Sequence, residues 1–314
     1  MTKLFEAALE NRDTRAISEL VLCTDTSALG AKGCEAAVLL GDEELMRTCI
    51  KQLTEPEADF WMARTDLLSG EHTSAITISL AALDKTKPSS LSISLCRGIA
   101  NALSDLGLWE ESMTILRSLM DNDLVSTNNV LLVKVLTDLF RARCRASLSV
   151  QRISDSVEEI VFEEVDQWRE QIFSLELKKW ALIWQLEGSD LAPRAATDID
   201  LRRVRKINDR FHNRFSPMIM STIEALGLLC ADHQDIAHDK LTKVVKESKS
   251  QPYCYYLAFE AVRIAQRYIG VECPLVLANK SLVARQETQA QNVRKLLAES
   301  STMGKVLKTI QAIQ

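Results

Sequence analysis

The stretch Leu68-Ser69-Gly70-Glu71 is typical of a tight turn between two helices, and similar junctions recur along the first third of the chain. The others are Leu9-Glu10-Asn11-Arg12-Asp13, Leu39-Leu40-Gly41-Asp42 and Leu106-Gly107-Leu108-Trp109. With Asn11, Gly41, Gly70 and Gly107 as the turn residues, the separations are 30, 29 and 37 residues. A repeat of this length indicates stacked pairs of helices.

Small residues stand at fixed distances from these junctions. Seven positions before Gly41, Gly70 and Gly107, on the first helix of each pair, the chain carries Cys34, Ala63 and Ala100. Five positions after the junctions, where the second helix is expected to cross the first, stand Ala16, Met46, Ala75 and Ser112. Met46 fits this pattern least well. The spacing predicts that the two helices of each pair approach each other closely.

This pattern resembles the tetratricopeptide repeat family. The matching positions are Ala63, Gly70, Ala75, Ala82, Leu83 and Pro88 in one unit, and Ala100, Gly107, Trp109 and Ser112 in the next. The resemblance covers roughly residues 1–121, with the tryptophan of the first helix missing and with spacings that depart from about 34 residues. It implies an all-α fold, namely a tetratricopeptide-like α-α superhelix (a right-handed helical-hairpin solenoid). It also implies capture of a peptide or helix along the concave face.

The pattern divides the chain into four parts of one continuous domain. We expect regular helical pairs over 1–121, an irregular long-helix segment over 122–217, further helical pairs over 218–280, and a C-terminal capping or docking helix over 281–314. A fifth junction, Ala231-Asp232-His233, has small residues at similar offsets, Ala225 and Ala237. Two prolines bracket a helix expected over 253–270. No segment keeps a period of two, so we expect no sheet.

Composition bounds the class of protein. The chain has 46% hydrophobic residues, only 10 Gly and 6 Pro, and a net charge of −5, which argue for a globular helical protein and against nonspecific nucleic-acid binding by the whole chain. The 8 cysteines are scattered singly, and no stretch has the length and apolarity of a signal peptide or membrane span. We therefore expect a cytoplasmic protein in a reducing compartment, with the nucleus left open and no membrane association.

The sequence contains no motif that carries known chemistry. It lacks a phosphate-binding glycine loop, a nucleophile elbow and a zinc-protease helix. His233 and His238 are five residues apart and face different sides of a helix, so they make a poor zinc site. Cys144 lies among arginines but has no identifiable base. We predict no catalytic residue, no cofactor and no metal, and therefore not an enzyme.

A basic amphipathic helix is predicted over 199–215. Its cations recur every four residues, at Arg202, Lys206, Arg210 and Arg214. One hypothesis is a site for an anionic partner, such as an acidic peptide, phosphate groups or an RNA backbone. The alternative is that this helix presents a solvated face or pairs with the acidic residues of 158–170.

A long helix predicted over 156–187 carries two tryptophans one turn apart, Trp180 and Trp184. They fill the core between helical layers or form an anchor for a partner. The C-terminal helix caps the repeats or docks on a second subunit.

Taken together, these features favour a non-catalytic interaction scaffold, adaptor or chaperone-like subunit of a cytoplasmic complex, which binds a protein partner through a peptide or helix. The candidate partner-binding residues are Arg202, Lys206, Arg210, Arg214, Trp180 and Trp184. The alternatives are a regulatory domain that senses a ligand or peptide, and an RNA- or phosphate-binding module that uses the helix over 199–215.

Overall fold

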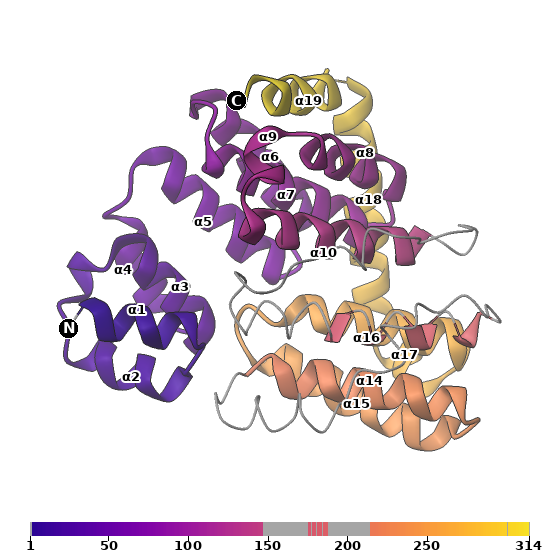
Figure 1. The fold of residues 1–314 in the computed structure, drawn as a ribbon. Helices are drawn as coiled ribbons and strands as arrows, with labels where there is room; N and C mark the ends of the chain where they lie inside the picture. Colours follow the sequence, from indigo (N-terminus) through magenta and orange to yellow (C-terminus); the bar gives the residue numbers. More distant parts are fainter. Residues whose placement is uncertain are drawn as a thin grey trace.

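In the computed structural model, the chain is described over residues 2–146, 175–176, 178–179, 181–183, 185–187, 214–299 and 301–313. These residues form helices joined by turns, with no strand among them, so the expected all-α class is confirmed for this part of the chain (Figure 1). Within the same residues, no helix is both long and apolar enough to cross a membrane.

The N-terminal half is a series of short helices. They are α1 (Thr2–Glu10), α2 (Thr14–Leu22), the 3₁₀ turn η1 (Thr26–Ala28), α3 (Gly30–Leu40), α4 (Glu43–Ile50), α5 (Glu55–Leu68), α6 (His72–Lys85), α7 (Ser90–Asp105), α8 (Trp109–Met120), α9 (Asp123–Ser126) and α10 (Asn129–Ala146). Each helix from α5 to α8 packs against its neighbours in sequence, as does α3 against α4, and α10 packs on α8. Consecutive hairpins therefore stack on one another.

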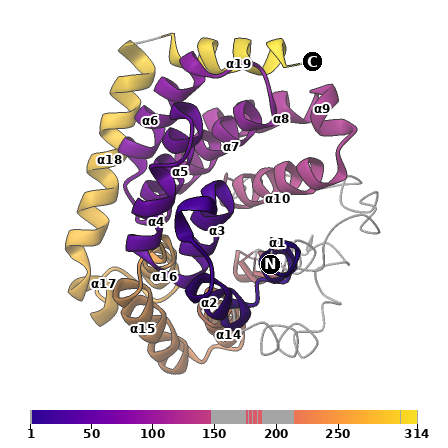
Figure 2. The same ribbon diagram turned by 90° about the vertical axis from the view of Figure 1, so that its left-hand side faces the viewer.

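The C-terminal part returns to these helices. It contains α14 (Ser216–Cys230), α15 (Gln234–Ser250), α16 (Tyr255–Tyr268), α17 (Pro274–Ala278), α18 (Lys280–Glu299) and α19 (Thr302–Ala312). The helix expected over 253–270 is confirmed as α16, while the tail consists of two helices that are separated near Ser301. Helix α18 runs beside α6, and α19 lies across α6, α7 and α8 (Figures 1 and 2).

One backbone geometry closes five of the hairpins. The turn residue is left-handed in each, with φ between 53° and 79°, at Arg12, Gly41, Gly70, Gly107 and Asp232. The amide of the next residue donates to the carbonyl five positions before it, over 2.8 to 3.0 Å. This Schellman hydrogen bond satisfies a carbonyl at the helix end, and the second helix starts two residues after the turn.

At the first hairpin the turn residue is Arg12, one position later than the expected Asn11. The side-chain amide of Asn11 donates to the carbonyl of Ala7, while the carboxylate of Asp13 accepts from the amide of Ala16 and caps α2. The interval to Gly41 is therefore 29 residues, and the position five after the turn is the fully buried Ile17. Ala16 is only half-buried. The predicted position of the first turn, Asn11, was therefore wrong by one residue.

The other small residues lie where the helices of a pair cross. Cys34, Ala63 and Ala100 are buried, and so are the residues five after the glycine turns. Between α7 and α8 the hydroxyl of Ser112 donates to the carbonyl of Ala100 over 2.7 Å. A larger side chain at either position would push the two helices apart. The predicted close approach is therefore present.

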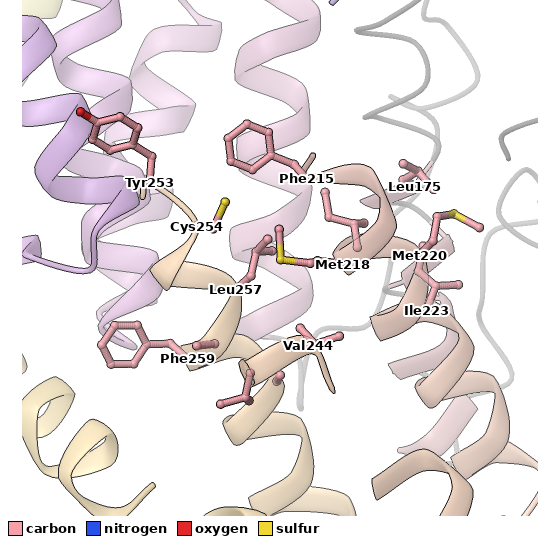
Figure 3. Close-up of a cluster of buried hydrophobic side chains, with 14 of the residues drawn as sticks. Leu175, Phe215, Met218, Met220, Ile223, Val244, Tyr253, Cys254, Leu257 and Phe259 are labelled. Atoms are coloured by element: carbon pink, nitrogen blue, oxygen red, sulfur yellow. The ribbon is translucent and has the colours of Figure 1, made fainter. Parts of the chain in front are cut away.

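Buried apolar residues form two clusters, each built from both ends of the chain. One joins α1–α5 to α14–α17, and the other joins α6–α10 to α18 and α19. Figure 3 shows part of the first cluster, where Met218 of α14 points toward Leu257 of α16 and Val244 of α15 lies nearby. The described residues of 175–187 contribute Leu175, Ala181 and Ile183 to this same core.

Candidate binding cavity

A cavity of about 530 Å³ lies between the first helices of successive pairs and α16. We call it the central cavity. Most of its described lining residues belong to α5, α7 and α10. Others come from α3, α6, α14 and α16, from the turn residue Arg12, and from Glu176 and Lys179. The cavity is therefore lined mainly by the inner faces of the repeated helices.

The repeat register accounts for which residues face this cavity. Six positions before the turn glycine, three successive pairs place Glu35, Arg64 and Asn101 on its wall. Ten positions before the glycine, α5 and α7 contribute Phe60 and Arg97. Equivalent positions of stacked hairpins share one face, so polar residues at these positions converge although they are far apart in sequence.

The cavity wall is rich in charge. Among the described residues that line it are six cationic side chains and five carboxylates: Arg12, Arg64, Arg97, Lys134, Arg141 and Lys179, against Glu35, Asp105, Asp138, Glu176 and Glu260. Charges in a site with little water interact strongly, and they must be paired or bound to remain ionised. The pairing pattern therefore decides what the cavity is able to bind.

Most of these charged side chains form one continuous series of ion pairs, in which cations and carboxylates alternate. Nε and Nη2 of Arg97 lie 2.9 and 2.6 Å from Oδ2 of Asp138. Nη1 of Arg141 lies 3.5 Å from Oδ1 of Asp138, and its Nη2 lies 3.1 Å from Oε1 of Glu176. Burial lowers the pKa of Arg141, but the charges of Glu176 and Asp138 outweigh it and raise that pKa above its ordinary value. Arg97, Asp138, Arg141 and Glu176 therefore form a continuous series of ion pairs along the cavity wall.

This series of ion pairs continues to α16 through a buried lysine. Nζ of Lys179 lies 2.6 Å from Oε2 of Glu176 and 2.8 Å from Oε1 of Glu260. Lys179 is 1% exposed. A lysine this deeply buried keeps its charge only beside carboxylates, so the contacts hold the 175–187 segment against α10 and α16.

Arg64 differs from the other cations. It makes no ion pair or hydrogen bond with any described residue, and its guanidinium carbon lies 5.6 Å from the centroid of the Trp61 ring. Burial lowers the pKa of Arg64; the charge of Glu35 raises it, and the charges of Arg12 and Arg97 lower it. Glu35 is itself paired with Arg12 at 3.0 Å. Among the described residues, Arg64 is thus an exposed guanidinium of the cavity wall that no carboxylate pairs.

Arg214 is the one predicted basic-helix residue that the structure describes. Its Nη2 donates to the carbonyl of Val38 at 3.1 Å and to that of Pro252, and the guanidinium lies over the Phe215 ring. Burial lowers its pKa. The side chain thus joins the end of α3 to the turn before α16.

The other predicted partner-binding residues, Arg202, Lys206, Arg210, Trp180 and Trp184, lie outside the described residues. Sequence analysis did not single out Arg64, Arg97 or Asp138, because none of them belongs to a recognisable motif or to a run of like charges. The repeat could have indicated Arg64 as a cavity residue, since Arg64 stands six positions before its turn glycine, as Glu35 and Asn101 do.

Two further observations complete the description. No group of three or more His, Cys, Asp or Glu side chains is arranged to hold a metal in the part of the chain that the structure describes. A comparison of the chain with known protein families, characterised proteins and solved structures gave no match.

Proposed function

We propose that this protein is a non-catalytic scaffold that captures a short acidic peptide segment of a protein partner in the central cavity. The observation that carries the proposal is Arg64, an arginine on the cavity wall that forms no ion pair with a carboxylate in the part of the chain that the structure describes. A carboxylate of the partner would supply the missing ion pair, and arginine is the side chain best suited to bind it through two parallel hydrogen bonds.

The position of the cavity supports a peptide as the ligand. The first helices of the pairs, α3, α5 and α7, contribute to its wall, and these are the helices expected to line the concave face of a helical-hairpin solenoid. The common turn geometry and stacked pairs support a tetratricopeptide-like superhelix as the architecture. In that architecture the cavity corresponds to the inner face, where Phe60, Trp61 and Leu67 offer apolar contacts beside Arg64.

The ion pairs of the other cations favour a ligand that places only one anionic group in the cavity. Arg97, Arg141 and Lys179 are held by their carboxylates, so an entering anion would compete with existing ion pairs for each of them. Arg64 has no such competitor, and an anion beside it would also relieve its repulsion from Arg12 and Arg97. We therefore expect a single acidic residue or a C-terminal carboxylate to be the anchor.

Selection from a random peptide library, followed by fluorescence anisotropy with the selected peptides, tests this function. We expect peptides enriched in Asp and Glu, with affinity that falls as salt is raised. Arg64→Ala should weaken binding by about tenfold or more, since a charge-assisted hydrogen bond contributes about 1.5–3 kcal/mol. Arg64→Lys should retain part of the affinity because the charge remains.

Arg294→Ala is the matched control, because Arg294 is an exposed arginine of α18 away from the cavity. It should bind the peptides as the unmodified protein does. Thermal unfolding of Arg64→Ala separates lost binding from lost folding, and we expect its midpoint to stay the same or rise. Selected peptides without acidic residues, or equal binding by Arg64→Ala, would contradict the proposal.

A further inference from the structure

A second pocket, of about 440 Å³, adjoins the central cavity, with which it shares Asp105, Tyr256 and Glu260. We call it the α16 pocket. Its long wall is one face of α16, from Tyr256 to Tyr268, and its opposite wall is formed by His72 at the start of α6 and by Asp105 and Trp109 at the turn between α7 and α8. A pocket of this size is within the range of about 300–1,000 Å³ that is usual for small-molecule sites.

Aromatic and aliphatic side chains make up much of this wall. Trp109, Tyr256, Phe259 and Tyr268 contribute rings, and Ile264 contributes an aliphatic surface. The rings have fixed positions: Nε1 of Trp109 donates to the carbonyl of Ser104, and the hydroxyl of Tyr268 donates to Glu187. Such a wall favours a flat, apolar ligand that is able to stack or to meet a ring edge.

The imidazole of His72 is a buried polar group of this wall without a hydrogen bond to any described residue. It is 1% exposed, and neither of its ring nitrogens makes a hydrogen bond. Its Nε2 lies 3.4 Å from Oδ2 of Asp105, and its ring meets the edge of Phe259 with centroids 5.8 Å apart. Buried polar groups are nearly always satisfied, and an unsatisfied one destabilises the fold. The imidazole is therefore held between Asp105 and Phe259, with both of its nitrogens buried and without a hydrogen-bond partner among the described residues.

The charged groups of the α16 pocket are already engaged. Arg267 is paired with Glu187 at 2.7 Å, and Nη1 of Arg263 donates to the carbonyl of Asp105 over 2.8 Å. Glu260 faces Lys179 at 2.8 Å, yet its Oε1 makes no hydrogen bond and retains an acceptor position. The two cations and two carboxylates among the described wall residues balance, so these residues give no net attraction to an ion.

We propose that the α16 pocket binds a small, uncharged, planar heteroaromatic molecule that hydrogen-bonds to His72. The ring stacks among the aromatic side chains, and its nitrogen or N–H satisfies one nitrogen of the imidazole. An N–H of the same ligand has the Oε1 of Glu260 as a second acceptor. The α16 pocket and the central cavity share Asp105, Tyr256 and Glu260, but His72 lines only the α16 pocket and Arg64 only the central cavity.

The test uses two probes of similar shape, benzimidazole and naphthalene, of which only benzimidazole forms hydrogen bonds. Titrations of the full chain followed by NMR give both dissociation constants. We expect both probes to bind at the same site, with benzimidazole the tighter. His72→Phe should weaken benzimidazole by about tenfold, the equivalent of one hydrogen bond, and leave naphthalene unchanged.

A blocking variant keeps the test decisive even if His72→Phe fails to fold. Val271 lines the pocket and is 57% exposed, so Val271→Trp should fill the pocket without disturbing the core and abolish binding of both probes. Leu277→Trp is the matched control, since Leu277 is 38% exposed and does not line the pocket. Arg64→Ala should also bind both probes normally, whatever it does to peptides.

The proposal is overturned if benzimidazole does not bind, if Val271→Trp binds both probes as the unmodified chain does, or if folded His72→Phe binds benzimidazole equally well. Binding of both probes with equal affinity to the unmodified chain would likewise overturn it, because His72 would then contribute nothing. Failure of peptide binding in the central cavity has no bearing on these outcomes, so the two proposals are tested apart.

Discussion

At the scale of single residues, the turn glycine Gly41 has a left-handed backbone and lies in close contact with another side chain. Gly41 has φ of 73°, and a Cβ there would lie 2.0 Å from Nη1 of Arg214. Arg214 in turn donates to the carbonyl of Val38. The absence of a side chain at Gly41 thus lets a distant arginine reach the end of α3, where a cation is favoured by the helix dipole.

We therefore expect Gly41→Ala to destabilise the protein. The left-handed conformation costs an L-residue about 1–2 kcal/mol, and the displacement of Arg214 adds to this cost. Gly98→Ala is the matched control, because Gly98 lies inside α7 and a Cβ there meets nothing within 4 Å. It should raise the free energy of unfolding by about 0.5–1 kcal/mol. Urea unfolding of both variants measures the difference, and a stable Gly41→Ala variant would refute the assignment.

At the scale of the element, α18 is attached to the repeat junctions through its polar residues. Gln289 donates to the carbonyl of Gly70 over 2.7 Å and accepts from the amide of Thr73 over 3.0 Å. Gln286 donates to the carbonyl of Asp105 over 2.7 Å. Turn carbonyls and helix-start amides lack partners within the helices, so glutamines on α18 satisfy them. These polar residues of α18 thus hold the helix against the repeats of its own chain.

Replacing one of these glutamines should loosen α18. Gln289→Ala leaves two buried backbone groups of the α5–α6 turn without partners, and we expect a loss of about 1–3 kcal/mol in the free energy of unfolding. Gln291→Ala, two residues further on the exposed side of α18, should change it by less than about 0.5 kcal/mol. Hydrogen exchange provides a second measurement, because the amide of Thr73 should exchange faster in Gln289→Ala only. Equal stability of the two variants would contradict the role of Gln289.

At the scale of the whole molecule, each of the two hydrophobic clusters contains residues from both the N-terminal and the C-terminal helices. A series of ion pairs also joins α7, α10 and α16. Lys179 sits at the centre of that series, between Glu176 and Glu260. Helices far apart in sequence therefore depend on one another, and we expect a single cooperative unfolding transition.

Lys179→Met should show this dependence. The change removes the cation but leaves Glu260 buried without its partner, which should cost about 3–5 kcal/mol. Lys246→Met, on the exposed face of α15, should have almost no effect. Adding Glu260→Gln to Lys179→Met should recover part of the stability, because the unpaired charge disappears. Denaturant unfolding of all three variants gives the comparison, and additive losses in the double variant would argue against a direct pair.

Much of the local structure could be predicted from the sequence. The junctions at Gly41, Gly70, Gly107 and Asp232 were located from neighbouring residues, because the left-handed turn and its hydrogen bond involve only six consecutive residues. At Arg12 the prediction missed by one position, since an asparagine favours this turn more than an arginine does. The site was less accessible to prediction, although the repeat register placed Glu35, Arg64 and Asn101 in equivalent positions.

The sequence by itself thus determined the all-α class, the hairpin turns and the small residues at the helix crossings, because these depend on short-range backbone geometry and on spacing along single helices. Only the tertiary structure decided which charges meet. Arg97 and Asp138 are 41 residues apart, and Gln289 and Gly70 are 219 apart. Such pairs depend on how helices distant in sequence pack together, and within the described residues that packing leaves Arg64 without an ion pair and His72 without a hydrogen bond.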